Sequence, residues 1–384
     1  MGDLQVRHGS QAGIARAHPN RSDPGQRRGR SAATRVGALI VVALSVAACL
    51  AAPHAGRIVA TGSLTTSRYH HTATLLSDGR VLIAGGDHES CTNSGCTTSY
   101  FDSAELYDPS TGTFRLTGSM TTPRSDHTAT LLHDGRVLIA GGRDSANEAY
   151  ASAELYDPAT GTFRPTGSMT SPRVGDAAVL LSDGRVLVAG GASAEVYDPK
   201  SGAFSPTGAM SIKQLGSTAV LRNGEVLISG GIPSSSLLSD GKALIAGSNG
   251  GYGSSVVAEL YDPRTGEFTS TGEWAATEGG EIQGRALYDP KTGMLNPLGQ
   301  EVTSIGDTVI ALADGRGMIA GAGCAADACW PPEVLDPDSN TFVEAGADQD
   351  RAPDRYATMT LLKDGRVLFA GGPGGDTWAG LFVP

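Results

Sequence analysis

An internal repeat of about 50 residues constrains the fold of this 384-residue chain more than any other feature. One copy reads HTATLLHDGRVLIAGG over 127–142 and continues as SAELYDPATGTFRPTGSM over 152–169. The preceding copy repeats both segments almost unchanged over 71–86 and 103–120. Self-similarity at this period marks a modular architecture, in which each unit must stack on its neighbours to bury an apolar face.

Each unit predicts four β-strands. The first two, Thr-Ala-Thr-Leu-Leu and Arg-Val-Leu-Ile-Ala, flank an Asp-Gly pair that favours a tight hairpin turn. The third is Ala-Glu-Leu-Tyr, and an Asp-Pro-x-Thr-Gly turn leads to a fourth strand that begins at Thr-Phe. The chain has 53 glycines and only 5% aromatic residues, which fits a turn-rich all-β protein better than a helical core.

The Gly141-Gly142 doublet, Tyr156 and Phe163 resemble the Kelch motif, with Phe where that motif usually has Trp. The resemblance implies an all-β, Kelch-type β-propeller of four-stranded blades over 49–384, similar to the central domain of galactose oxidase. Strand counting predicts seven blades, with six as the alternative, and the repeats are degenerate over 223–300.

The two ends of the repeat region predict how the ring closes. Residues 379–384 match only the third strand of a unit, whereas 61–64 match the end of a fourth strand. We therefore expect an amino-terminal strand to complete the last blade, which removes the open edges of a partial sheet.

The amino end predicts export. Residues 1–35 contain seven Arg and no Lys, and the apolar run 36–48 has the length of a signal-peptide core. The run ends in Val-Ala-Ala before Cys49, which resembles a bacterial lipobox. We expect 1–48 to be a signal peptide with lipobox, Cys49 to be lipidated, and the mature chain to be an extracytoplasmic lipoprotein at the cell envelope. The alternative is a plain secreted protein.

The remaining four cysteines form two pairs of identical spacing, Cys91 with Cys96 and Cys324 with Cys329. In an oxidising compartment each pair is expected to close a local disulfide. A four-Cys zinc site built from both loops and a set of free thiols are the alternatives.

Loop variability predicts which face binds. In an up-and-down blade, the second-to-third and fourth-to-first connections share one face, and the variable loops 87–102, 143–151 and 322–332 belong to it. The predicted binding residues enter the first strands on that face: Arg68, Tyr69, His70, Arg124, Asp126, Arg173, Asp176, Lys213, Asp354, Arg355 and Tyr356. The structural alternative is that each Arg pairs with an Asp of a neighbouring blade.

The sequence favours a monomeric module that binds a protein or a glycan at the cell envelope. A net charge of −11 argues against nucleic acid, and we expect membrane contact only through the lipid anchor. No catalytic residue, metal site or cofactor is predicted, since no His follows position 133 and copper oxidases of the galactose-oxidase type need ligands further along. A galactose-oxidase-like or sugar-isomerase-like enzyme and a structural surface spacer are the alternatives.

Overall fold

The computed structural model describes residues 55–384, apart from short gaps. These gaps are 93–94, 192, 213, 216, 222, 224, 230–234, 249–255, 275–284, 299–307, 321–323, 326–327, 330, 348–356 and 372–376. The predicted signal peptide and Cys49 lie outside the described residues, as do Lys213, Asp354, Arg355 and Tyr356. No helix that could span a membrane occurs in the described part of the chain.

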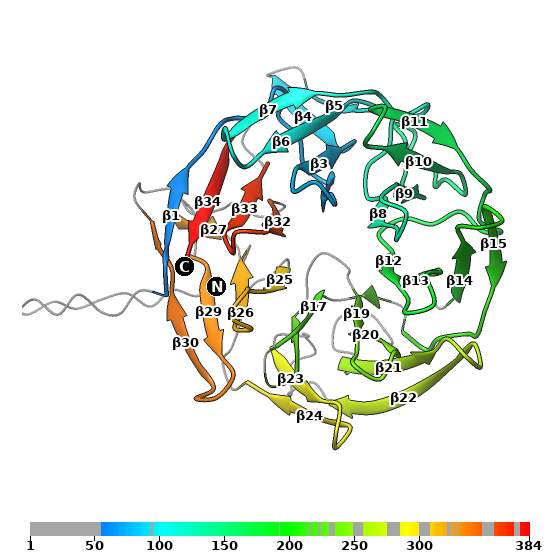
Figure 1. Cartoon of the computed structure of the whole chain (residues 1–384), viewed down its shortest axis with the longest axis vertical. Coiled ribbons are helices and arrows are strands. Elements are labelled where there is room, and N and C mark those ends of the chain that lie inside the picture. The colour runs from blue at the N-terminus through cyan, green and yellow to red at the C-terminus, as the bar shows by residue number, and fades with distance from the viewer. Residues whose placement is uncertain are drawn as a thin grey trace, which may run out of the picture. The chain divides into compact units, whose positions relative to one another are not determined.

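Residues 50–384 form one compact unit, a ring of seven four-stranded antiparallel sheets (Figure 1). The predicted all-β propeller with seven blades is therefore confirmed, and the six-bladed alternative is wrong. Blades 1 to 3 follow the chain in order, each with its first strand nearest the centre. They are β2 (Thr72–Leu75), β3 (Val81–Ala84), β6 (Ala104–Asp108) and β7 (Thr113–Leu116); β8 (Thr128–Leu131), β9 (Val137–Ala140), β10 (Ala153–Asp157) and β11 (Thr162–Pro165); and β12 (Ala177–Leu180), β13 (Val186–Gly190), β14 (Ser193–Asp198) and β15 (Ala203–Pro206).

Blades 4 and 5 are nested, because one blade is inserted into the other. Along the chain, the two inner strands of blade 5 come first, followed by all four strands of blade 4 and then by the two outer strands of blade 5. In chain order these strands are β17 (Ser217–Val220) and β18 (Val226–Ser229); β19 (Ser235–Leu237), β20 (Ala243–Ser248), β21 (Val256–Asp262) and β22 (Glu267–Trp274); and β23 (Ala286–Asp289) and β24 (Met294–Pro297). A short strand, β16 (Gln214–Leu215), also pairs with β20.

The nesting explains why two repeats look broken in the sequence. The copy near 223 has only its first two strands and the copy near Tyr288 only its last two, and the pairing of β18 with β23 joins these halves into one sheet. The contacts of β19 with both β12 and β17 place blade 4 between blades 3 and 5. These strands thus occupy ordinary blade positions, reached in a non-sequential order.

Blades 6 and 7 complete the ring. Blade 6 consists of β25 (Thr308–Ala311), β26 (Gly317–Ala320), β29 (Glu333–Asp336) and β30 (Thr341–Glu344). Blade 7 consists of β32 (Thr358–Leu361), β33 (Val367–Ala370), β34 (Ala379–Val383) and the amino-terminal β1 (Arg57–Ala60). The antiparallel pairing of β1 with β34 confirms the predicted ring closure, and a short β31 (Gly346–Ala347) lies parallel to β1.

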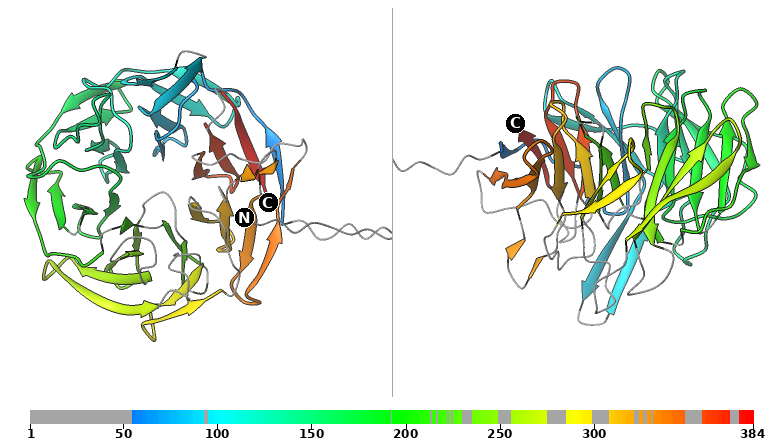
Figure 2. Two further views of the ribbon diagram at one scale, coloured as in Figure 1. Left: turned by 180° about the vertical axis from the view of Figure 1, so that it is seen from behind. Right: turned by 90° about the horizontal axis from the view of Figure 1, so that it is seen from below.

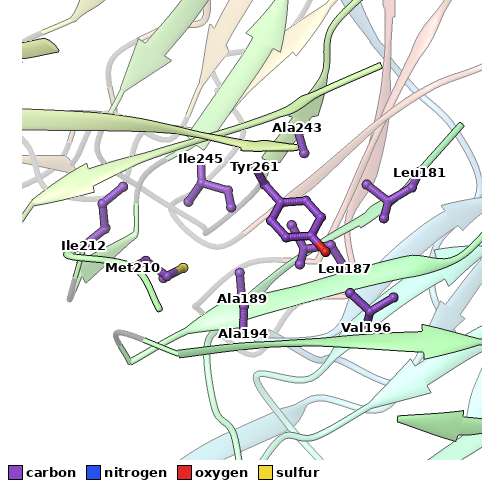
Figure 3. Close-up of a cluster of buried hydrophobic side chains, with 10 residues drawn as sticks. All are labelled: Leu181, Leu187, Ala189, Ala194, Val196, Met210, Ile212, Ala243, Ile245 and Tyr261. Atoms are coloured by element: carbon purple, nitrogen blue, oxygen red, sulfur yellow. The ribbon is translucent and has the colours of Figure 1, made fainter. Parts of the chain in front are cut away.

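Apolar clusters between adjacent blades form the core. Second strands such as β3 and β9 are buried along their whole length, because neighbouring sheets cover both of their faces. Figure 3 shows one cluster, in which Leu187 and Ala189 of blade 3 pack with Ile245 and Tyr261 of blade 4.

A repeated polar clasp also joins blades. The hydroxyl of a third-strand Tyr contacts a Thr that follows the outer strand of the preceding blade, as in the 3.0 Å contact between Tyr156 and Thr117. The next residue, Gly118, donates its backbone N–H to Gly161 O at 3.0 Å. Among the described residues, the same clasp recurs as Thr61–Tyr107, Thr166–Tyr197 and Thr207–Tyr261. Each clasp supplies the partner that a buried tyrosine hydroxyl needs.

Removal of the closing strand tests the role of β1. A chain that starts at 65 loses the buried side chains of Ile58 and Leu64 and the whole ladder to β34. Deleting two such side chains alone costs about 4–10 kcal/mol. Thermal unfolding should therefore show a much lower Tm, or no cooperative transition, relative to a chain that starts at 50. Equal Tm values for the two chains would contradict closure by β1.

Candidate functional site

The longest connection among the described residues lies on the predicted binding face. In blade 1, β3 and β6 are joined by a hairpin of β4 (Asp87–Thr92) and β5 (Gly95–Tyr100), which extends beyond the disc in the right-hand view of Figure 2. In blade 6 the equivalent connection contains the short pair β27 (Cys324–Ala325) and β28 (Ala328–Cys329).

A disulfide joins Cys91 to Cys96 near the end of the β4–β5 hairpin. The backbone register of β27 and β28 places Cys324 directly opposite Cys329, as Cys91 lies opposite Cys96. The two pairs belong to connections of different blades, so the cysteine nearest to each one along the backbone pairing lies in the same hairpin. A second disulfide remains a prediction.

Three of the predicted binding arginines are buried, and each forms the same clamp within its own blade. Arg124 is fully buried, and its guanidinium donates to Gly141 O at 2.7 Å, to Ser152 O at 3.2 Å and to the Glu154 carboxylate at 2.9 Å. Arg68 and Arg173 make the equivalent contacts, with Glu105 and Glu195 as their acidic partners.

The clamp gives these arginines a structural task. The structural alternative named an Asp of a neighbouring blade as the partner, but each arginine pairs with a Glu on the third strand of its own blade. Arg173 also contacts Asp176 at 3.2 Å. Each clamp ties the segment that enters the first strand to the Gly carbonyl after the second strand. The face is thus held in place from beneath by buried ion pairs.

The glycine doublet is one of the places where the backbone of a neighbouring blade approaches closely. Gly141 and Gly142 have φ values of 72° and 90°. A Cβ on Gly141 would lie 2.7 Å from Arg173 O, and the Gly142 N–H donates to the same oxygen at 2.8 Å. Only glycine combines this backbone conformation with such an approach.

Two buried histidines link the innermost strands. His71 Nε2 lies 3.1 Å from Thr358 Oγ1 of blade 7, and His127 Nε2 lies 2.9 Å from Thr72 Oγ1 of blade 1. Burial, reinforced by the charges of Arg68 and Arg124, lowers the pKa of each imidazole to about 3. Both rings are therefore neutral at physiological pH and belong to the frame of the propeller.

The residues that precede His71 and His127 have a left-handed backbone conformation. His70 and Asp126 have φ values of 53° and 52°, and blade 3 has Gly175 at 65° in the equivalent place. A backbone chain connects the three: Asp126 N donates to His70 O at 3.0 Å, and Gly175 N donates to Asp126 O at 2.9 Å. Non-glycine residues in this conformation cost about 1–3 kcal/mol each and concentrate at functional sites.

The side chains of His70 and Asp126 start a polar group that we name the His70 cluster: His70, Asp87, Asp126, Arg143 and Asn147. His70 Nδ1 lies 2.8 Å from Asp87 Oδ1. Arg143 pairs with Asp126 at 2.7 Å and donates to Asn147 Oδ1 at 2.8 Å. Burial lowers the pKa of His70, but the hydrogen bond to Asp87 and the charges of Asp126 and Asp87 outweigh it, so the net shift is upward.

Partly exposed aromatic rings surround this cluster. The Tyr69 ring centroid lies 5.0 Å from that of His70 and 6.4 Å from that of His88. Tyr100 and Tyr150 lie on the hairpin of blade 1 and the corresponding loop of blade 2, both half-buried. Burial raises the pKa of all three tyrosines, so their hydroxyls stay protonated and can donate hydrogen bonds.

The structure therefore assembles part of the predicted site and adds to it. It brings together Tyr69, His70 and Asp126, while Arg68, Arg124, Arg173 and Asp176 lie in the supporting layer. Residue-level sequence reasoning missed Asp87, His88, Tyr100, Arg143, Asn147 and Tyr150, because it identified their loops only as variable. For Asp87, His88 and Arg143 the available signal was their position just after a Gly-Gly doublet, since that turn directs the loop back toward the segment that enters the first strand. The other three lie further along their loops, where the sequence carries no such signal.

Comparisons with known proteins agree with the fold. The chain is a seven-bladed β-propeller, and the Kelch motif family matches residues 123–170, which span blade 2. A solved structure described as a novel fungal alcohol oxidase of the AA5 family, in complex with copper, is similar with a TM-score of 0.50 and 16% identity, over 85% of this chain and 75% of that one. No curated protein matches the sequence. The chain is thus a seven-bladed β-propeller that contains a Kelch motif, which confirms the Kelch resemblance seen in the repeats.

The copper of that oxidase raises the question whether this chain offers a comparable donor set. Among the described residues, one group of His, Cys, Asp and Glu is close enough to hold an ion, namely Glu89, Cys91 and Cys96. His71 and His127 contact threonines through Nε2 instead of converging on one point. Beyond that group, the described residues bring no three His, Cys, Asp or Glu side chains close enough to hold an ion, and we derive no chemistry through copper.

The buried clamp predicts a large stability difference between two arginine variants. Arg124→Met removes the partner of the buried Glu154 carboxylate and should destabilise the fold by about 3–5 kcal/mol in chemical denaturation. Arg136→Met breaks an exposed pair with Asp134 and should cost about 1 kcal/mol or less. Similar losses for both variants would show that the buried clamp stabilises the fold no more than an exposed ion pair does.

The buried histidines predict acid sensitivity. Their pKa values are lower in the folded state than the unfolded value of about 6.5, so the unfolded chain binds more protons below that pH. Their contribution should be intact above pH 6.5 and should decline as pH falls toward 3. Asp176 acts in the opposite sense: burial raises its folded pKa to about 6, so its contribution is present at low pH and is lost as pH rises through 6.

Unfolding free energies measured from pH 7 to pH 4 test the contribution of the two buried histidines. A His71→Gln/His127→Gln variant should lose stability at pH 7 but should show a flatter decline on acidification than the unmodified chain. His133→Gln, at an exposed position, is the control and should keep the original slope. An unchanged slope in the double variant would mean that other groups control the acid response.

Proposed function

We propose that this protein is a glycan-binding propeller whose site is the His70 cluster with the tyrosines beside it. The observation that carries the proposal is the pair of strained residues, His70 and Asp126, whose side chains are fixed by ion pairs yet remain about one fifth exposed. Strain kept in the folded state is typical of positions that present side chains to a ligand.

The chemistry of the cluster suits a sugar. Tyr69 and Tyr100 offer ring faces against which the apolar face of a pyranose can pack, and their hydroxyls can donate hydrogen bonds. Asp126, Arg143 and Asn147 supply charged and neutral hydrogen-bonding groups already held in place by one another. Such preorganisation reduces the ordering cost of binding.

A protein ligand is less well supported by the same face. Protein interfaces usually contain a buried apolar centre. Of the large apolar side chains exposed in the described residues, Val174 lies on a connection of this face, while Leu116, Leu237 and Met294 lie on strands of other regions. The described loops around His70 are mainly polar.

Export and lipid anchoring belong to the same proposal. The arginine-rich start, the apolar run and Cys49 support delivery to the cell envelope, and the Cys91–Cys96 disulfide suits an oxidising compartment. A propeller tethered through Cys49 would then present its loop face to envelope or environmental glycans.

A glycan panel tests the binding site. The unit 50–384 should bind a restricted set of oligosaccharides, and Tyr69→Ala and Arg143→Ala should each weaken that binding roughly tenfold or more, since about 1.4 kcal/mol corresponds to a factor of ten. Arg115→Ala, on the outer strand β7, is the matched control and should bind as the unmodified unit does.

Melting curves of all variants should be recorded beside the binding data, so that unfolding is not mistaken for loss of contact. Equal binding by the Tyr69 and control variants would place the site elsewhere. Absence of any glycan binding, together with capture of an envelope protein, would replace this proposal with a protein-binding one.

A further inference from the structure

The β4–β5 hairpin is a ribbon without a core of its own. From Glu89 to Ser99 its described residues are exposed on both faces, and most are polar. A two-stranded ribbon is at best marginally stable in water by itself. At its base, Asp87 lies opposite Tyr100 and contacts His70, whereas near its tip the Cys91–Cys96 link holds the strands together. The hairpin therefore depends on a cross-link at its tip.

The register places a third metal-binding side chain beside this cross-link. Cys91 pairs with Cys96, and Glu89 lies two residues before Cys91 on the same strand, opposite Thr98. Because side chains alternate along a strand, Glu89 and both cysteines share one face of the ribbon. One carboxylate oxygen and the two sulfurs lie within 4.8 Å of one another.

We propose that this hairpin is a redox-gated zinc site, in which Glu89, Cys91 and Cys96 bind Zn²⁺ once the disulfide has been reduced. Two thiolates and one carboxylate are ligands that zinc commonly takes, and four residues between the cysteines fall within the usual spacing of zinc-binding pairs. Three protein ligands leave the fourth tetrahedral position open to water or to an external ligand. Catalytic zinc sites have such an open position, whereas structural zinc sites have four protein ligands.

The redox step balances with a dithiol reductant. The disulfide accepts two electrons and two protons and becomes two thiols, while the dithiol gives up the same and closes its own disulfide. Zinc binding then releases the two thiol protons, because thiolates are the ligands. The hairpin thus exchanges one cross-link for another and stays closed in both states. This inference does not rest on the proposed glycan site.

The cysteine hairpin of blade 6 provides a comparison within the same chain. Cys324 and Cys329 have the same spacing and the same backbone register, but the residue two before Cys324 is Ala322 instead of a glutamate. The second hairpin therefore has no carboxylate at the position of Glu89, and its own acidic residue, Asp327, lies between the two cysteines. We expect the metal to prefer the blade 1 hairpin.

Metal uptake by the full chain tests the proposal. After reduction, the unmodified chain should bind about one more Zn²⁺ than Cys91→Ser/Cys96→Ser, measured by elemental analysis after desalting. Co²⁺ in place of Zn²⁺ should give a sulfur-to-cobalt charge-transfer band that the double variant lacks. Glu89→Gln should raise the dissociation constant roughly tenfold or more, and Cys324→Ser/Cys329→Ser should retain the band.

Three results would overturn the proposal. The first is equal zinc and an equal band in the reduced Cys91→Ser/Cys96→Ser variant. The second is equal uptake by the oxidised and reduced unmodified chain, and the third is no uptake on reduction. Unchanged melting of the variants would show that these results report on the hairpin and not on the propeller, since the hairpin lies outside the core clusters.

Discussion

The buried arginine–glutamate pair is the interaction on which the arrangement of the proposed binding face depends. A charge taken from water must have its hydrogen bonds supplied by the protein. Arg124 obtains them from Glu154 on the third strand, from Ser152 before that strand and from Gly141 after the second strand. One side chain therefore fixes three segments of a blade, and its repetition in blades 1 to 3 gives their loops a common base.

Because the clamps anchor the loops of blades 1 to 3, the backbone of those loops can keep strained conformations. His70 and Asp126 hold left-handed backbones because the segments on either side are anchored and because backbone hydrogen bonds run from blade to blade. Their side chains meet Asp87 and Arg143, which come from loops that the doublet glycines turn inward. The result is a polar site whose geometry depends on packing between blades and not on any single loop.

Much of the fold follows from local signals. The Asp-Gly and Asp-Pro-x-Thr-Gly turns, the all-apolar second strands and the unmatched ends predict the blades and the closure by β1, and the structure confirms them. Whether the arginines contact a ligand or form buried ion pairs was harder to predict. An Arg at a loop position is equally compatible with a ligand contact or a buried pair, and the choice depends on Glu105, Glu154 and Glu195, which lie two strands away in the sheet.

The sequence by itself determined the strands, the turns and the repeating unit, since these depend on residues close together along the chain. Only the tertiary structure decided that the sequence of blade 4 is inserted between the two halves of blade 5, because the pairing of β18 with β23 joins strands separated by a whole blade. It also decided the His70 cluster, whose members come from two blades and from connections between them. Contacts of that kind depend on how blades pack, and no local pattern encodes them.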